Sequence, residues 1–576
     1  MANPGFNMSL RRGLTPGLAS GRGLTHEVPM REPMNFGIQY LGDGYSTEAK
    51  LMGRQAAGKA LLKGITDTWP EGPIFGFGQG TASRAMLTQV RGNGYQGKIS
   101  WWEQGGGRPS VFPTAIYHPG PLHESLAHAR NKANPRAYSL FGVTHTLSST
   151  GVMDALAAHC GAPFQPWDAL ICTSLAGHRV VETLIAERRA WLKEHFGATR
   201  FAQIQLPVIP LGVDVPAQAR SGEDIAEARA RFEISSHETV FFFAGRLSFH
   251  AKANPAPIYV AMERAAQASG RALVCLEAGQ YFNPDMAVHF QRAQQTLAPS
   301  VRFIHVDGSD SAAYRQAWCA ADVFTSISDN IQETFGLTPV EAMAAGLPVL
   351  VSDWDGYKDT VRDGVDGYRI PVVGLVPGGA DDLAERHALG VDTYDRYIGQ
   401  VSMATSVDVG QLAQRIQALA EDPALRIRLG ESGQARARAE YDWPVVLRRY
   451  QALVHELDRL RVAAPPQPAQ PWLLRPDPTH LFSHFPTHLM GGEWRVRAEP
   501  GRETALAELL GLFMVNYVLD PERLPADLIT DLHRLAMMGP KTVGQLLEAS
   551  GGGGRAKVRA LMWLAKSGLV ELSPPR

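Results

Sequence analysis

Short apolar runs alternate with amphipathic helical patterns along most of the chain. In the first part, runs typical of buried strands occur at 34–41, 73–77, 110–117, 138–145, 167–173 and 203–209. In the second part they occur at 239–245, 272–276, 301–306, 322–327, 347–352 and 368–371. Strands that alternate with helices in this way build parallel sheets with helices on both faces. We therefore predict an α/β fold with two doubly wound, Rossmann-like sheets.

Changes in composition divide the chain further. Residues 1–33 are rich in Gly, Pro and Arg without periodicity, which predicts a disordered tail. Prolines in 463–475 predict a stiff, extended linker. We expect Rossmann-like domains at 34–212 and 213–444, a crossover helix at 445–462 and a small, mostly helical domain at 476–576.

The stretch 328–349 lies between two of the predicted strands and contains one short predicted helix. Thr338 suits the N-cap of this helix, Pro339 its first position and Gly346 the residue just past its end. The pattern predicts a strand–loop–helix–strand unit.

Two carboxylates, Glu333 and Glu341, lie on this unit. The N–H groups after Gly336 would attract an anion such as a diphosphate, because a helix N-terminus carries free donors and positive dipole. The carboxylates would accept hydrogen bonds from hydroxyls on either side, and a nucleotide sugar supplies both kinds of group. As an alternative, Thr338-x-x-Glu341 is also a capping box, and Glu333 is then an ordinary loop acid.

The spacing Glu333-x7-Glu341, followed by the string at 342–349, resembles the donor-site signature of family 4 retaining glycosyltransferases. Segments at 208–214, 244–247 and 363–368 match further pieces in the same order, so the resemblance covers about 34–460. It implies a GT-B fold, in which an acceptor domain (34–212) and a nucleotide-sugar donor domain (213–444) face a cleft.

The resemblance also implies roles for the residues of the central unit. Glu333 would hold hydroxyls of the transferred sugar, and Glu341 would hold the ribose. The N–H groups around Gly336, Leu337 and Thr338 would bind the phosphates. Neither glutamate need be a covalent nucleophile.

Further site residues follow from the same resemblance. Arg246 and Lys252 would neutralise the diphosphate, although their spacing of six differs from the usual five. His145, at the end of a predicted strand, would lie near the donor sugar, and Gly42 and Gly44 would approach the phosphates or the acceptor. The alternatives are solvated surface cations, a structural histidine and an ordinary tight turn.

Composition and charge narrow the class of protein. The chain has 576 residues, is 45% hydrophobic and carries a net charge of −1, which indicates a globular protein without a general attraction to nucleic acid or acidic lipid. Its four cysteines are scattered and suggest buried thiols in a reducing compartment. We found no signal peptide, membrane span or metal-binding motif, so we expect a cytoplasmic protein without a metal.

Two regions fall outside the resemblance. Residues 372–407 have no counterpart in the family pattern and read as a solvated excursion that faces an acceptor or a partner. The segment from 542 to 571 resembles a winged-helix module, with Arg555, Lys557, Arg559 and Lys566 on one helix. The region is nearly charge-balanced, which argues against DNA and leaves protein docking or dimerisation open.

The leading hypothesis is a retaining glycosyltransferase that moves a sugar from a nucleoside diphosphate to an acceptor hydroxyl, with no other cofactor. Rival hypotheses are a sugar-nucleotide-sensing regulator with a DNA- or protein-binding tail, and a GT-B phosphorylase or epimerase. The sugar, the base, the acceptor, homo-oligomerisation and peripheral membrane contact stay open at this stage.

Overall fold

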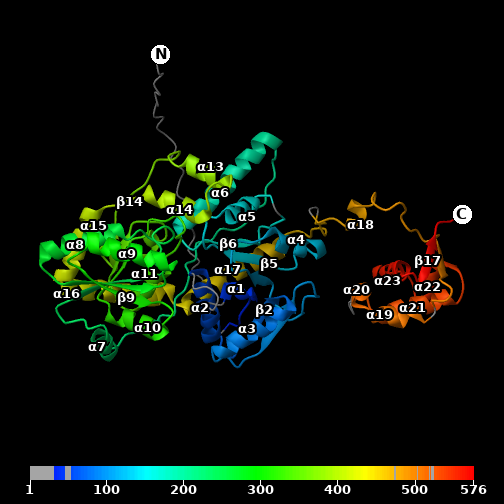
Figure 1. Cartoon of the computed structure of the whole chain (residues 1–576), viewed down its shortest axis with the longest axis horizontal. Helices are drawn as coiled ribbons and strands as arrows, with labels where there is room; N and C mark the ends of the chain where they lie inside the picture. The colour runs from blue at the N-terminus through cyan, green and yellow to red at the C-terminus, as the bar shows by residue number, and fades with distance from the viewer. Residues whose placement is uncertain are drawn as a thin grey trace, which may run out of the picture. The chain divides into compact units, whose positions relative to one another are not determined.

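The computed structural model describes residues 32–45, 53–161, 163–472, 475–502, 504–517, 519 and 524–575. It divides into two compact units, 1–472 and 473–576 (Figure 1). The first unit contains two lobes, each built on a six-stranded parallel sheet. The tail expected at 1–33 lies largely outside the described residues.

The first lobe has strand order β3-β2-β1-β4-β5-β6. Its strands are β1 (Gly37–Gln39), β2 (Ile74–Gly78), β3 (Ile99–Glu103), β4 (Ala115–Tyr117), β5 (Ser139–Val143) and β6 (Ala169–Ile171). Its helices are α1 (Gly42–Tyr45), α2 (Gly53–Thr68), α3 (Gly80–Gly92), α4 (Glu124–Ala133), α5 (Thr150–Ala158) and α6 (Leu175–Phe196). Most of these strands are buried along their whole length, as expected for a sheet covered on both faces.

The second lobe repeats the pattern with strand order β12-β11-β10-β7-β8-β9. Its strands are β7 (Thr239–Ala244), β8 (Leu273–Gly279), β9 (Arg302–Asp307), β10 (Val323–Ser326), β11 (Val349–Ser352) and β12 (Gly367–Ile370). Its helices are α7 (Gly222–Arg231), α8 (Ala256–Ser269), α9 (Pro284–Leu297), α10 (Ser311–Ala320), α11 (Leu337–Ala344), α12 (Tyr357–Thr360), α15 (Val409–Glu421) and α16 (Pro423–Arg436). Both doubly wound sheets are as predicted.

Local chemistry sets several helix ends. Side chains of Ser174, Asn283 and Asp310 accept from backbone N–H groups at the starts of α6, α9 and α10. Gly197 and Gly270 end α6 and α8 in the left-handed conformation that favours glycine.

Helix α17 (Trp443–Ala463) returns from the second lobe and packs on the first sheet (Figure 1). Its Tyr450 ring lies 6.0 Å from Phe141 and 6.4 Å from Phe36, measured between centroids. Trp443 fills the space beside Gly64 and Gly212, where any Cβ would lie within 2.5 Å of the indole. Helix α17, which follows the second lobe in the chain, therefore completes the core of the first lobe.

Prediction and structure differ at two strands. Residues 203–209 form only isolated bridges, Gln205 with Ala169 of β6 and Val208 with Cys172 just after it, because Pro207 lacks the N–H group that a ladder needs between them. Strand β3, which the pattern missed, is the edge of its sheet and is mostly half-buried, so its sequence carries little apolar signal.

The remaining part of the second lobe lies between β12 and α15. It contains β13 (Val372–Val373), α13 (Asp381–Ala388), α14 (Tyr394–Met403) and β14 (Ser406–Val407). The two strands pair antiparallel, so residues 372–407 form an outgrowth that is closed at its base.

After α17 the chain runs without regular secondary structure along α4. The Gln470 N–H donates to the Asn131 carbonyl at 2.8 Å, and the Trp472 indole stacks on His128 with centroids 5.0 Å apart. The proline-rich segment is therefore tied to the first lobe.

The C-terminal unit is built from a three-stranded antiparallel sheet and several helices. Its elements are α18 (Pro478–Leu481), β15 (Arg495–Ala498), α19 (Ala505–Leu510), α20 (Phe513–Asn516), α21 (Ala526–Met537), β16 (Lys541–Thr542), α22 (Val543–Ala549), α23 (Arg555–Lys566) and β17 (Val570–Ser573). The sheet order is β16-β15-β17. Lys557 of α23, the helix predicted to be basic, donates to the carbonyls of Ser550 and Gly552. These hydrogen bonds close the turn after α22.

None of the helices in the described ranges has the length and apolar character needed to cross a membrane.

Candidate active site

The residues predicted to bind an anion meet where the second sheet reverses its strand order. β7 and β10 are hydrogen-bonded neighbours, although β8 and β9 separate them along the chain. Arg246 follows β7 and Glu333 follows β10, so both leave the carboxyl ends of adjacent strands. In open α/β sheets, ligands bind outside this reversal point.

An ion pair joins the two loops. The Lys252 ammonium contacts the Glu333 carboxylate, and their side chains are only 20% and 15% exposed. Arg246 Nη2 donates to Gln332 Oε1 at 2.8 Å. The fold thus brings both predicted cations to the Glu333 loop.

The two predicted carboxylates differ in their electrostatics. Burial raises the pKa of Glu333, but the Lys252 charge and hydrogen bonds outweigh it and hold that pKa below its ordinary value. Thr334 N–H is one of those donors, at 3.4 Å from Glu333 Oε1. Gly336 N–H donates to the same oxygen at 3.1 Å. For Glu341, burial raises the pKa to about 7, and the Lys252 charge offsets it only in part. Near neutral pH, the Glu333 carboxylate is therefore ionised, whereas the Glu341 carboxyl group is partly protonated.

The N-cap of α11 is Gly336 and not Thr338, which corrects the sequence prediction. Gly336 has a φ of 90°, and a Cβ there would lie 2.3 Å from the Tyr357 ring, so only glycine fits. Helix α11 has no side-chain cap, so the capping-box alternative for Glu341 is not realised. Gly346, with a φ of 74°, follows the helix end as predicted.

The Glu333 loop also touches the first lobe, at His145. Thr334 Oγ1 donates to the His145 carbonyl at 2.7 Å, and Ser174 Oγ donates to the Thr334 carbonyl at 2.7 Å. His145 and Gly44 line one hollow of the first lobe, whereas Gly42 is exposed at the start of α1. His145 and Gly44 therefore lie together, in a hollow that does not include Arg246 or Lys252.

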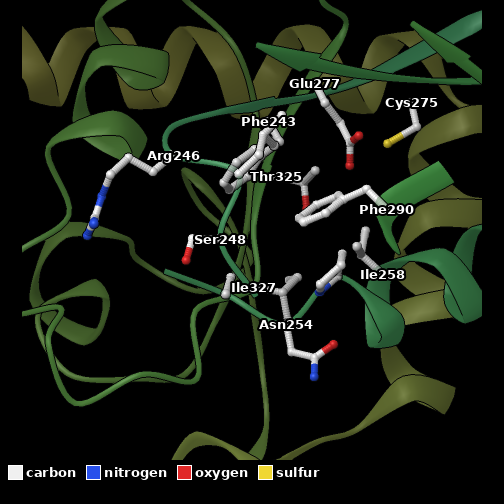
Figure 2. Close-up of a pocket in the computed structure, with 13 residues that line it drawn as sticks. Phe243, Arg246, Ser248, Asn254, Ile258, Cys275, Glu277, Phe290, Thr325 and Ile327 are labelled. Carbon is white, nitrogen blue, oxygen red and sulfur yellow. The ribbon is translucent and has the colours of Figure 1, made fainter. Parts of the chain in front are cut away.

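A second pocket lies on the opposite side of the Arg246 loop. Figure 2 shows the Arg246 side chain extending away from Glu277, Phe290 and Thr325, which gather in this pocket between the sheet and α8 and α9. Glu277 accepts from Tyr259 at 2.5 Å, and burial raises its pKa to about 7. Arg246 also lines this pocket, whereas Lys252 and Glu333 do not.

Sequence reasoning missed Asp355, which follows β11. Among the described residues, only Asp355 (φ 34°) and Glu233 (φ 54°) combine a side chain with a positive φ. Asp355 Oδ1 accepts from Gly356 N–H, while Oδ2 is buried with no hydrogen-bond partner in the described chain. A Cβ at Gly356 would lie 2.5 Å from Phe335 Cα, so this turn packs on the Glu333 loop.

The surroundings of Asp355 are electrostatically unfavourable. Burial and the nearby Glu333 charge raise its pKa well above the ordinary value. Strained backbone is typical of functional sites, where the surrounding structure holds it in place. The signal available in the sequence was a carboxylate shortly after a strand that neighbours β10.

Across the described residues, no three His, Cys, Asp or Glu side chains gather in a way that could hold a metal ion.

Comparisons with known proteins match parts of this chain. Residues 224–386 match the family model described as glycosyl transferases group 1. D-inositol 3-phosphate glycosyltransferase of Nocardia farcinica is 32% identical over 190 residues, which is 32% of this chain and 40% of that protein. Phosphatidyl-myo-inositol mannosyltransferase of Mycobacterium leprae is 32% identical over 174 residues, which is 29% of this chain and 36% of that protein. The matches thus span well under half of these relatives.

Among solved structures, Anabaena HepE in complex with UDP aligns with 73% of this chain and 99% of its own, at 18% identity and a TM-score of 0.46. The two parallel six-stranded sheets with flanking helices are the GT-B architecture, to which this chain adds a C-terminal region. The family match includes the loops of Arg246, Lys252 and Glu333 and the helix of Glu341, and it supports a glycosyltransferase.

Proposed function

We propose that the protein is a retaining glycosyltransferase of family 4, which moves a sugar from a nucleoside-diphosphate sugar to an acceptor hydroxyl without a metal. The observation that carries the proposal is the cluster of Arg246, Lys252 and Glu333 at the strand reversal, beside the N-terminus of α11. One cluster thus offers cations for a diphosphate and a carboxylate for hydroxyls.

In this proposal each group has a defined task. Arg246 and Lys252 meet the oxygens of the diphosphate, where negative charge grows as the bond between sugar and phosphate breaks. Glu333 accepts hydrogen bonds from sugar hydroxyls, and Glu341 accepts them from the ribose. The acceptor oxygen forms the new bond on the face that the phosphate leaves, and the leaving phosphate oxygen takes the acceptor's proton.

Ligand binding gives a direct test of the substrate class. A nucleotide sugar at 100 times its dissociation constant should stabilise the folded protein by about 2.7 kcal/mol. Thermal unfolding against a panel that includes UDP-glucose, UDP-N-acetylglucosamine and GDP-mannose should show one clear stabiliser, with free sugars as the control. A panel in which no nucleotide sugar moves the midpoint would contradict the proposal.

Product analysis separates the rival enzyme classes. A transferase should release nucleoside diphosphate only when acceptor is added, whereas an epimerase needs no acceptor and a phosphorylase uses free phosphate. The sensor hypothesis has less support, because Lys557 of the basic helix already bonds two carbonyls. Gel-shift titration at physiological salt would reveal specific DNA binding if it existed.

Asp355→Gly should separate backbone strain from chemistry. Glycine adopts a φ of 34° freely and removes a carboxylate that opposes Glu333, so the thermal midpoint should hold or rise. Turnover should nevertheless fall by about tenfold, because we expect the unpartnered Oδ2 to bind a donor hydroxyl. Glu233→Gly, which relieves the same kind of strain at an exposed position, is the matched control and should leave turnover unchanged. Wild-type turnover in Asp355→Gly would make Asp355 a structural residue only.

A further inference from the structure

The outgrowth at 372–407 packs against the loop that carries the two cations. A Cβ added at Gly399 of α14 would lie 3.0 Å from the His250 Cβ, so helix and loop are in close contact. Asn254 Nδ2 lies 3.4 Å from the Met403 sulfur at the other end of α14. His250 and Asn254 flank Lys252, so the outgrowth rests on the segment that fixes this cation.

Tyr394, the first residue of α14, belongs to a chain of hydrogen bonds that starts at Arg246. Arg246 Nη2 donates to Gln332 Oε1 at 2.8 Å. Because a guanidinium can only donate, it fixes the amide with Nε2 on the other side. Gln332 Nε2 then donates to the Tyr394 hydroxyl at 3.4 Å. The tyrosine hydroxyl is also hydrogen-bonded to Ser148 Oγ, at 2.7 Å, and either oxygen can be the donor of that bond.

This chain of contacts crosses from one lobe to the other. Ser148 is buried in the first lobe, in the segment between β5 and α5. Arg246, Gln332 and Tyr394 all belong to the second lobe. The orientation of the Arg246 guanidinium is thereby linked to a contact with the opposite lobe.

Charge reinforces the link at Arg246. Burial lowers the pKa of the guanidinium, and the negative charges of Asp395 and Glu333 oppose that shift. Asp395 directly follows Tyr394 on α14. The guanidinium is therefore attracted by the outgrowth as well as by the Glu333 loop.

We propose that Tyr394 is a positioning residue for Arg246: through Gln332 it holds the guanidinium toward the donor's diphosphate, and Ser148 of the first lobe completes the arrangement. The inference rests on the proposed function and assigns the outgrowth a part in it. The Arg246 guanidinium is then fully positioned only when Ser148 of the first lobe contacts Tyr394 of the second. Stabilisation of the leaving diphosphate therefore depends on contact between the two lobes.

The first test compares two tyrosines of α14. Tyr394→Phe removes the hydroxyl that joins Gln332 to Ser148, and kcat should fall about tenfold with KM for the donor within twofold. Tyr397→Phe is the control, because the contact of that residue is a ring stack on His387 at 4.8 Å, which phenylalanine preserves. Both variants should unfold at the wild-type temperature. Equal kcat in the two variants would overturn the proposal.

The second test asks whether Tyr394 acts through Gln332. Gln332→Leu should lower kcat by a similar factor, and the Tyr394→Phe, Gln332→Leu double variant should be no slower than the slower single variant. Multiplying effects would show that the two residues act independently and would overturn the proposed route.

The affinity for a nucleoside diphosphate tests the positioning of Arg246 by Tyr394 without any measurement of turnover. Free UDP and GDP carry the charge that the leaving group gains in the transition state, which the donor itself lacks. Calorimetry should therefore show that Tyr394→Phe weakens binding of the nucleoside diphosphate that wild type binds by threefold or more, while Tyr397→Phe does not. Unchanged affinity in Tyr394→Phe would overturn the inference. A wild type that binds a diphosphate but transfers no sugar would count against the proposed function alone.

Discussion

Arg246→Ala is expected to lower turnover at least a hundredfold while the protein stays folded. A fixed cation stabilises the leaving diphosphate most in the transition state, and a loss of this size corresponds to about 3 kcal/mol. Steady-state release of nucleoside diphosphate in the presence of acceptor would measure it.

The control for this variant is Arg264→Ala, which removes an exposed arginine from α8 of the same lobe. Both variants should keep the wild-type unfolding temperature to within a few degrees. Turnover near that of wild type in Arg246→Ala would remove the assignment of this residue, whatever happens to the control.

The second large effect concerns the pair formed by Lys252 and Glu333. Glu333→Gln should lower turnover a hundredfold or more, since the amide replaces an ionised carboxylate that we propose to hold the sugar. It should also destabilise the fold by about 3 kcal/mol, because the mostly buried Lys252 ammonium loses its counter-charge. Lys252→Met should destabilise by a similar amount.

Combining the two substitutions distinguishes stability from catalysis. The double variant contains no stranded charge, so its unfolding temperature should exceed that of either single variant while turnover stays low. Thermal unfolding and single-turnover rates measure the two quantities on the same samples. Additive loss of stability would mean that the ion pair is not a coupled unit.

The same pair predicts a pH dependence. The folded protein holds the pKa of Glu333 below its ordinary value, so the pair stabilises the fold above that value. This contribution disappears as pH falls through the lowered pKa, and Lys252→Met should flatten that part of the stability profile.

Sequence patterns predicted those parts of the site that depend on strand ends. Arg246 and Glu333 each follow a buried strand, and parallel sheets deliver such residues to one edge. The partners of these residues could not be predicted, because Gln332 and Tyr394 meet only through packing of the outgrowth. Asp355 escaped notice because its strain is a property of the folded backbone.

The fold was predicted where apolar runs were long, and missed where burial was partial. Strand β7 is almost entirely buried and its run was unmistakable, whereas β3 at the sheet edge is mostly half-buried. The Thr338 prediction followed side-chain preference, but the Tyr357 ring lies against the chain at Gly336 and demands a residue without a Cβ.

The chain passes between the lobes twice, and the two crossings are bonded to each other. Val213 N–H donates to the Tyr441 carbonyl at 2.8 Å, and Trp443 N–H donates to the Val213 carbonyl at 3.2 Å. Because these hydrogen bonds hold the two crossings together, we expect them to act as one hinge when the lobes rotate. Any opening between the lobes would then be a rotation about this paired segment.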